Sequence, residues 1–177
     1  GFAQDRLVYL AFSEPGDGGA GTAVTRGRLG ERGLEGTQVI WRQVPKVTGP
    51  NHWGSRLVFR PDGTLFVTLG DRYHYPERAQ DLSTTLGKIV RINADGSVPR
   101  DNPFVGREGA RPDIWSYGHR NIQAAALDAR GRLAYARASR DRAGGRVAAL
   151  VGGRDAENDP FVERVARAQT LAARRYR

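Results

Sequence analysis

The sequence predicts an all-β fold, and three observations support this prediction. Short apolar runs with strand character recur along the chain, glycine-centred turns separate them, and few segments have the periodicity of an amphipathic helix. The turn glycines Gly63, Gly96 and Gly131 lie 33 and 35 residues apart. Taken alone, this spacing fits the repeated hairpins of a β-propeller and the evenly sized hairpins of a β-sandwich equally well.

The first expected strand covers residues 7–12 (LVYLAF). Residues 13–21 (SEPGDGGAG) predict a loop, because proline and clustered glycines disfavour a strand interior. Residues 22–43 then predict two strands, which separate around Gly30 and Gly33.

Residues 51–71 (NHWGSRLVFRPDGTLFVTLGD) predict a tight hairpin. Gly63 supplies the positive φ that the reversal at residues 61–63 needs. The side chains expected on one buried face are Leu57, Phe59, Leu65 and Val67. His52 precedes the first strand and Asp71 follows the second, so the hairpin brings both residues to the same end.

The pattern recurs around Gly96 in residues 87–99 and around Gly131 in residues 125–136. Two long loops, residues 70–87 and 99–121, separate these segments. Long loops inside a compact domain are usually functional or disordered, and the aromatic residues in both loops favour order.

The length and composition predict one globular domain. The 177 residues are 39% hydrophobic and 27% charged, and there is no cysteine, which excludes disulfides, thiolate metal sites and cysteine nucleophiles. The sequence contains neither an apolar run long enough to span a bilayer nor a signal-like segment. We therefore expect no membrane span and no signal peptide in this chain, which starts at Gly1 without Met.

The formal charge of +9 is concentrated in the C-terminal part. Residues 130–177 contain twelve arginines and five acidic residues, a net charge of +7. A basic tail of this kind could bind nucleic acid through phosphate contacts, but the sequence has no recognisable nucleic-acid motif. We therefore predict no nucleic-acid partner.

Two polar groups could carry chemistry. An Asp71 carboxylate beside the His52 imidazole would orient the ring and raise its basicity, as a general base requires. Alternatively, Asp71 only caps the turn after Gly70. In residues 117–121 (YGHRN), Arg120 offers a fork of donors for carboxylate or quinone oxygens and Asn121 adds an amide, although a plain polar loop would look the same. The sequence contains no calcium-loop motif, phosphate-binding P-loop or nucleophile-elbow serine.

Three segments together resemble the soluble pyrroloquinoline quinone (PQQ)-dependent sugar dehydrogenases, the glucose/sorbosone dehydrogenase family. They are NHWGSRLVFRPDGTLFVTLGDR, DLSTTLGKIVRINADGSVPRDNPF and IWSYGHRNIQ, and the resemblance covers roughly residues 5–128. It implies that the chain is about half of a six-bladed β-propeller that binds PQQ with the help of calcium. It also implies an aldose sugar as substrate, an external electron acceptor and a periplasmic or secreted location.

The resemblance also implies roles for four residues. His52 would take the proton from the sugar C1 hydroxyl while hydride passes to PQQ and a lactone forms. Asp71 would assist His52, and Arg120 and Asn121 would bind the quinone oxygens. The fragment could be inactive alone, and the alternative is a non-catalytic propeller fragment or binding module.

The sequence departs from the family after Asn121. Residues 122–124 (IQA) replace Pro-Gln-Gly, and the Glu-His-Gly-Pro type segment that supplies calcium ligands in the family is absent, so we assign no metal ligand. We expect a partial propeller over residues 1–128 and a divergent basic tail over residues 129–177. A frameshift between about residues 121 and 135 would explain the Arg/Ala/Gly-rich tail. A genuine helix over residues 159–177 would explain its apolar spacing.

Overall fold

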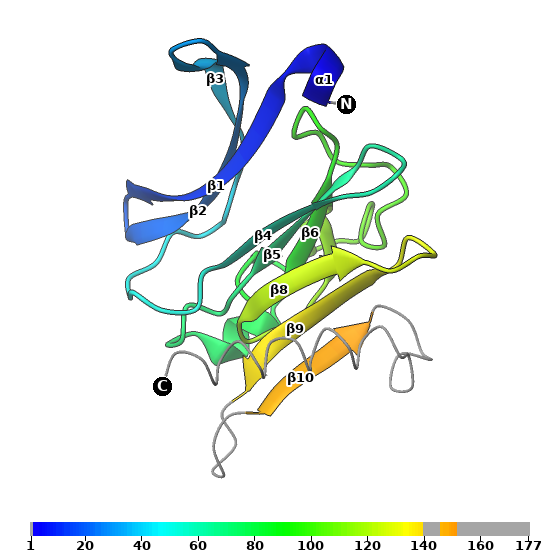
Figure 1. Ribbon diagram of the computed structural model, residues 1–177. Helices are drawn as coiled ribbons and strands as arrows, with labels where there is room; N and C mark the ends of the chain where they lie inside the picture. Colours follow the sequence, from blue (N-terminus) through cyan, green and yellow to red (C-terminus); the bar gives the residue numbers. More distant parts are fainter. Residues whose placement is uncertain (1, 140–145, 152–177) are drawn as a thin grey trace.

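The computed structural model describes residues 2–139 and 146–151. In this part of the chain, three antiparallel sheets follow one another in sequence order after a short helix, α1 (Phe2–Asp5) (Figure 1). The first sheet contains β1 (Leu7–Gly16), β2 (Gly19–Gly30) and β3 (Gly33–Arg42). The second contains β4 (Gly54–Phe59), β5 (Leu65–Leu69), β6 (Ile89–Ile92) and β7 (Ile114–Ser116). The third contains β8 (Ile122–Leu127), β9 (Leu133–Ser139) and β10 (Arg146–Val151). The all-β prediction is confirmed.

The second sheet is buried on both faces, and β5 shows this most clearly. Leu65, Val67 and Leu69 point toward the first sheet, where they form one core cluster with Val24 and Trp41. Alternate residues point the other way, and Phe66 joins a second cluster at the third sheet, with Ile89, Ile122, Leu133 and Tyr135. Because each buried side chain of this size contributes about 1.5–3 kcal/mol, these two clusters hold the three sheets face to face.

The β4–β5 hairpin forms where the sequence predicts it. Leu57 pairs with Val67 across the ladder, and both belong to the core cluster against the first sheet or pack on it. Phe59 differs from the prediction because its side chain remains 42% exposed. It lies at the turn end of β4, where its ring meets only the edge of Tyr9 at a centroid distance of 4.8 Å.

The three turn glycines share one geometry. Gly63, Gly96 and Gly131 have φ values of 82°, 91° and 73°, which favour glycine. Each N–H donates to the carbonyl three residues earlier, at 3.0, 2.9 and 3.0 Å. The turns at Gly63 and Gly131 close hairpins, whereas the strand that returns to pair with β6 after Gly96 is β7, which begins only at Ile114.

The predicted loop over residues 13–21 is wrong. Strand β1 continues through Pro15, which pairs with Ala20, and only Asp17 and Gly18 form the turn to β2. Proline is tolerated here because β1 is the edge strand of its sheet. An edge strand has one side with no neighbouring strand, and on that side a missing N–H removes no hydrogen bond of the sheet.

The third sheet extends past the predicted domain boundary at residue 128, because β9 pairs with both β8 and β10. The division into residues 1–128 and 129–177 therefore remains a prediction, as does the frameshift. The helix proposed over residues 159–177 lies outside the described residues. Within the described part, no helix has the length and apolar character needed to cross a membrane.

Lys88 attaches the long loop of residues 70–87 to the second sheet. Its side chain is fully buried, and Nζ donates hydrogen bonds to the carbonyls of Arg78, Ala79 and Leu86 at 2.8, 3.0 and 2.8 Å. The first two carbonyls belong to the short 3₁₀ helix η1 (Pro76–Ala79). Burial lowers the pKa of Lys88 to about 8, against an opposing effect of the Asp81 charge.

We expect stability to rise with pH because of Lys88. Between about pH 8 and pH 10.5 the unfolded chain binds the proton that the folded chain has lost, so the free energy of unfolding increases through this window, by about 3 kcal/mol. Urea denaturation across this range measures the effect. The chain has only two lysines, Lys46 and Lys88. In NMR spectra of the ε-¹³C-lysine-labelled chain, the Lys88 signal therefore reports its titration, and the Lys46 signal is the internal reference. A flat or falling stability, or a Lys88 resonance that titrates above pH 10, would contradict the expectation.

Candidate active site

The structure brings His52 and Asp71 together at one end of the β4–β5 hairpin. Gly54 of β4 pairs with Leu69 of β5, so the segment before β4, which carries His52, lies beside the segment after β5, which carries Asp71. The His52 Nδ1 atom lies 2.7 Å from Asp71 Oδ1. An ionised carboxylate only accepts, so this contact assigns the proton to Nδ1 and leaves Nε2 as the proton-accepting nitrogen of a neutral ring.

The Asp71 carboxylate is 1% exposed and accepts three hydrogen bonds. Besides the His52 ring, the backbone N–H of Tyr73 donates to Oδ1 at 2.8 Å, and Arg120 Nη1 donates to Oδ2 at 2.6 Å. Asp71 therefore caps the turn after Gly70 and also contacts the imidazole, and its part in proton transfer stays a prediction. Its three partners satisfy a buried charge that would otherwise be costly.

Unusual backbone conformations surround this pair. Five non-glycine residues in the described part have positive φ, and four of them flank the hairpin end: His52 (54°), Ser55 (69°), Arg72 (56°) and Tyr73 (69°). Such conformations cost energy and are concentrated at functional sites. Gly70 explains part of the geometry, because a Cβ at this position would collide with the backbone carbonyl of His52. The absence of a side chain at Gly70 lets the His52 loop approach the end of β5.

Arg72 fixes the loop that carries His52, and the sequence pattern alone does not reveal this role. Its side chain is fully buried and donates to the carbonyls of Asn51 at 3.1 Å, Ala20 at 2.9 Å and Gly49. The guanidinium also stacks on Trp53, with Cζ 3.3 Å from the ring centroid. Burial lowers the pKa of the Arg72 guanidinium below its ordinary value. Arg72 thus joins the first sheet, the His52 loop and the end of β5.

Tyr73 covers the site from the solvent side, which the sequence did not indicate either. Its ring is 48% exposed and meets the His52 ring edge-on at a centroid distance of 5.1 Å. The Arg120 Cζ atom lies 5.2 Å from the same ring centroid, within the range of a cation–π contact. Tyr73 therefore contacts both side chains that flank the Asp71 carboxylate.

Arg120 reaches the same place from just before the third sheet, and Asn121 is the next residue along the chain. The Arg120 carbonyl accepts the Asp71 N–H at 2.9 Å, and its side chain remains 43% exposed. Among the described residues, Arg120 Nε and Nη2 have no hydrogen-bond partner. The Asn121 amide is only 7% exposed and is also unpartnered within the described part. Two neighbouring groups are thus available to bind the oxygens of a ligand.

The other two histidines do not join the pair. His119 is 3% exposed, with Nε2 2.9 Å from Ser116 Oγ and its ring against Tyr135, which is the setting of a core histidine. His74 is exposed and contacts the outer side of Tyr73 at a centroid distance of 5.1 Å. Across residues 2–139 and 146–151, no group of three or more His, Cys, Asp or Glu side chains could hold a metal ion. The calcium expectation remains a prediction.

Consecutive antiparallel sheets that pack face to face, with polar residues gathered at one end of the strands, define a β-propeller, and this chain is about half of a six-bladed one. The family model "Glucose / Sorbosone dehydrogenase" matches residues 1–139. The chain belongs to this family.

Relatives and solved structures agree with this assignment. The aldose sugar dehydrogenase YliI of Escherichia coli (strain K12) is 48% identical over 130 residues, covering 72% of this chain and 35% of the relative. The apo crystal structure of the soluble aldose sugar dehydrogenase from Escherichia coli superimposes with a TM-score of 0.76 at 42% identity, over 82% of this chain and 43% of that one. The PQQ-bound aldose sugar dehydrogenase from Streptomyces coelicolor gives a TM-score of 0.66 at 29% identity, over 79% and 40%. The chain therefore spans less than half the length of the proteins it matches.

Proposed function

We propose that this chain is part of a PQQ-dependent aldose sugar dehydrogenase that oxidises the C1 hydroxyl of a sugar to a lactone. The observation that carries the proposal is the contact of His52 with a buried carboxylate that also pairs with Arg120, whose other guanidinium nitrogens are unpartnered in the described part of the chain. The dehydrogenase names of the relatives support the reaction class, and the PQQ-bound neighbour supports the cofactor.

The residues present fit a quinone. The carbonyl oxygens of a quinone need hydrogen-bond donors, and Arg120 and Asn121 both have donors that are unused in the described part of the chain. PQQ, when bound, would supply the quinone that accepts the hydride from the sugar C1. Calcium would assist as the family resemblance implies.

The chain's own contribution is proton transfer and orientation. His52 Nε2 accepts the proton of the C1 hydroxyl, and the resulting imidazolium is stabilised by the Asp71 carboxylate at Nδ1. Asp71 holds the tautomer in which Nε2 is unprotonated, and Arg72 holds the loop on which the ring lies. The electrons leave to an external acceptor, and the proposed location is periplasmic or secreted.

His52→Ala tests the proposal. We expect aldose-dependent dye reduction with PQQ and Ca²⁺ to fall about a thousandfold, since general-base catalysis of this kind contributes 10²–10⁴. The matched control is His74→Ala, which removes the exposed histidine on the other side of Tyr73 and should leave the rate within about twofold. The assay is made on this chain and on a longer one that continues into the family's remaining sheets.

The outcomes separate the two candidate functions. Activity in the longer chain that disappears with His52→Ala supports the enzyme, whether or not the shorter chain is active. If neither chain reduces PQQ, the enzyme proposal is wrong. The alternative, a non-catalytic propeller fragment, is favoured only by the part-length match to the relatives.

A further inference from the structure

A pocket with aromatic and basic lining lies between the second and third sheets, at the turn end of the β4–β5 hairpin. It has a volume of about 550 Å³, within the range of small-molecule sites. The side chains that define it are Arg60, Phe66, Trp115, Arg130, Arg132 and Leu133. Arg60 follows β4 directly, whereas His52 precedes it, so the pocket and the candidate active site are at opposite ends of the same strand.

The pocket lining is strongly basic. It contains three arginines and no carboxylate. Arg60 Nη1 pairs with Asp62 at 3.1 Å, and Arg132 Nε pairs with Asp128 at 2.6 Å. Arg130 is exposed, and its guanidinium has no ion-pair or hydrogen-bond partner among the described residues. At least one positive charge at the pocket is therefore left without a counter-charge in this part of the chain.

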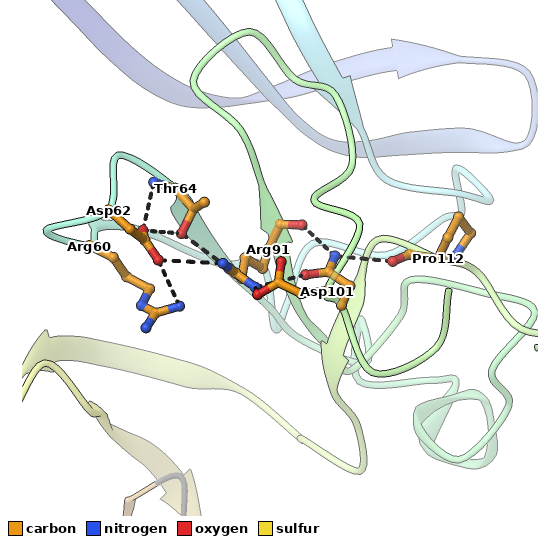
Figure 2. Close-up of polar contacts among 7 residues, drawn as sticks. Arg60, Asp62, Thr64, Arg91, Asp101 and Pro112 are labelled. Atoms are coloured by element: carbon orange, nitrogen blue, oxygen red, sulfur yellow. Dashed lines mark hydrogen bonds and ion pairs between the residues drawn. The ribbon is translucent and has the colours of Figure 1, made fainter. Parts of the chain in front are cut away.

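The carboxylates near Arg60 already form ion pairs with arginines. Figure 2 shows that Asp62 lies between Arg60 and Arg91. Arg91 in turn pairs with Asp101 at 3.0 Å. Hydrogen bonds from Thr64 hold the pKa of Asp62 below its ordinary value, so this carboxylate stays ionised at neutral pH. Asp62 and Asp101 thus pair with arginines of this network, and neither carboxylate belongs to the pocket lining.

Flat aromatic surfaces lie beside these charges. The rings of Phe66 and Trp115 are 5.5 Å apart at 59°, and Arg60 Cζ is 5.7 Å and 6.0 Å from their centroids. Arg60 Nε is buried without a hydrogen-bond partner in the described structure, so the aromatic rings and Asp62 hold this guanidinium. Phe66 is 2% exposed and lies in the core, whereas Trp115 is half-buried, so a ligand here would meet the Trp115 ring together with guanidinium donors.

This combination selects one chemical class of ligand. An inorganic oxyanion would pair with the arginines but leave the accessible part of the Trp115 ring uncovered, and a neutral sugar would not use the positive charge. A planar ring with a carboxylate uses both, because guanidinium and carboxylate form paired hydrogen bonds while the ring packs on Trp115. We propose that the pocket binds a small aromatic carboxylate. The proposal does not depend on the sugar dehydrogenase function.

Benzoate is the probe, and the indole N–H signals of the ¹⁵N-tryptophan-labelled chain are the readout. The chain has three tryptophans, at positions 41, 53 and 115, and Trp115→Phe assigns the pocket signal. We expect benzoate to shift the Trp115 signal saturably. Benzamide, which has the ring without the charge, and inorganic phosphate, which has the charge without the ring, should each bind at least tenfold more weakly.

Matched variants test which groups bind the probe. Arg130→Gln should weaken benzoate binding about tenfold, and it is an exposed position where folding is not at risk. Arg107→Gln removes an exposed arginine that contacts Phe104 outside the pocket and should change the affinity less than twofold. His52→Ala should also leave it unchanged, which separates this pocket from the candidate active site.

Several results would overturn the proposal. These are no saturable shift of Trp115, equal binding of benzamide or phosphate, or an Arg130→Gln variant that binds like the parent chain. A benzoate shift confined to Trp53, which lies beside His52, would place the anion at Arg120 instead and would also overturn it.

Discussion

Replacing Arg72 by Met lowers the free energy of unfolding by about 3 kcal/mol and releases the loop that carries His52. The guanidinium donates to three backbone carbonyls and stacks on Trp53, so its loss leaves buried acceptors unsatisfied. Hydrogen bonds to charged groups contribute about 1.5–3 kcal/mol each, and part of this gain is offset because a buried charge is also removed. Urea denaturation followed by tryptophan fluorescence measures the change, since Trp53 reports on the same contact.

Two further variants complete the Arg72 experiment. Arg72→Lys keeps the charge, but one ammonium cannot span carbonyls from three separate segments, so we expect only part of the stability to return. Arg107→Met removes an exposed arginine that lies over an aromatic ring and should cost less than about 1 kcal/mol. An Arg72→Met variant as stable as this control would show that Arg72 does not hold the loop.

Asp71→Asn is expected to change the protonation pattern of His52 while keeping the shape of the site. The amide presents one oxygen and one donor where the carboxylate accepts from the His52 ring, Tyr73 and Arg120. If the amide oxygen stays with Arg120, the amide NH₂ faces Nδ1 of His52 and the ring proton moves to Nε2. Nε2 can then no longer accept a proton from the sugar hydroxyl. We expect sugar oxidation by the longer chain to fall a thousandfold or more.

The tautomer gives a readout that does not depend on PQQ. ¹⁵N spectra of histidine-labelled chain should show the His52 proton on Nδ1 in the parent and on Nε2 in Asp71→Asn. Asp95→Asn is the matched control, because Asp95 also accepts from a turn, through Ser97 at 2.9 Å, but is exposed. Unchanged His52 nitrogen signals in the Asp71 variant would show that the carboxylate does not orient the ring.

The sequence predicts that His52 and Asp71 lie at the same end of the hairpin, because apolar alternation and the Gly63 turn set the pairing of Leu57 with Val67. A bulge between Gly54 and Leu57 then shifts the register by one residue, so that Gly54 pairs with Leu69 and His52 falls opposite Asp71. No sequence pattern indicated this bulge. The resemblance to the family added Arg120 and Asn121, whose position no local pattern reveals. Arg120 reaches Asp71 because the second and third sheets pack together, which depends on the whole of the core around Phe66.

Other features were beyond prediction for physical reasons. The contacts of Arg72 come from residues 20, 49 and 51, and a single arginine in a sequence does not show which carbonyls it will meet. Lys88 reads as an ordinary charged residue between apolar ones, although its burial depends on the path of the preceding loop. The strand through Pro15 was missed because the tolerance of proline depends on its place at the edge of a sheet.

The connectivity of the site has a consequence for how such a site can be gained or lost. His52 and Asp71 are 19 positions apart and are joined by one hairpin, whereas Asp71 and Arg120 are 49 positions apart and belong to neighbouring sheets. The His52–Asp71 pair is thus a local unit that one duplicated or transplanted hairpin could carry intact. Arg120 comes with the next blade, so recombination between blades could separate the proposed acid–base chemistry from the proposed cofactor recognition without disturbing either fold unit.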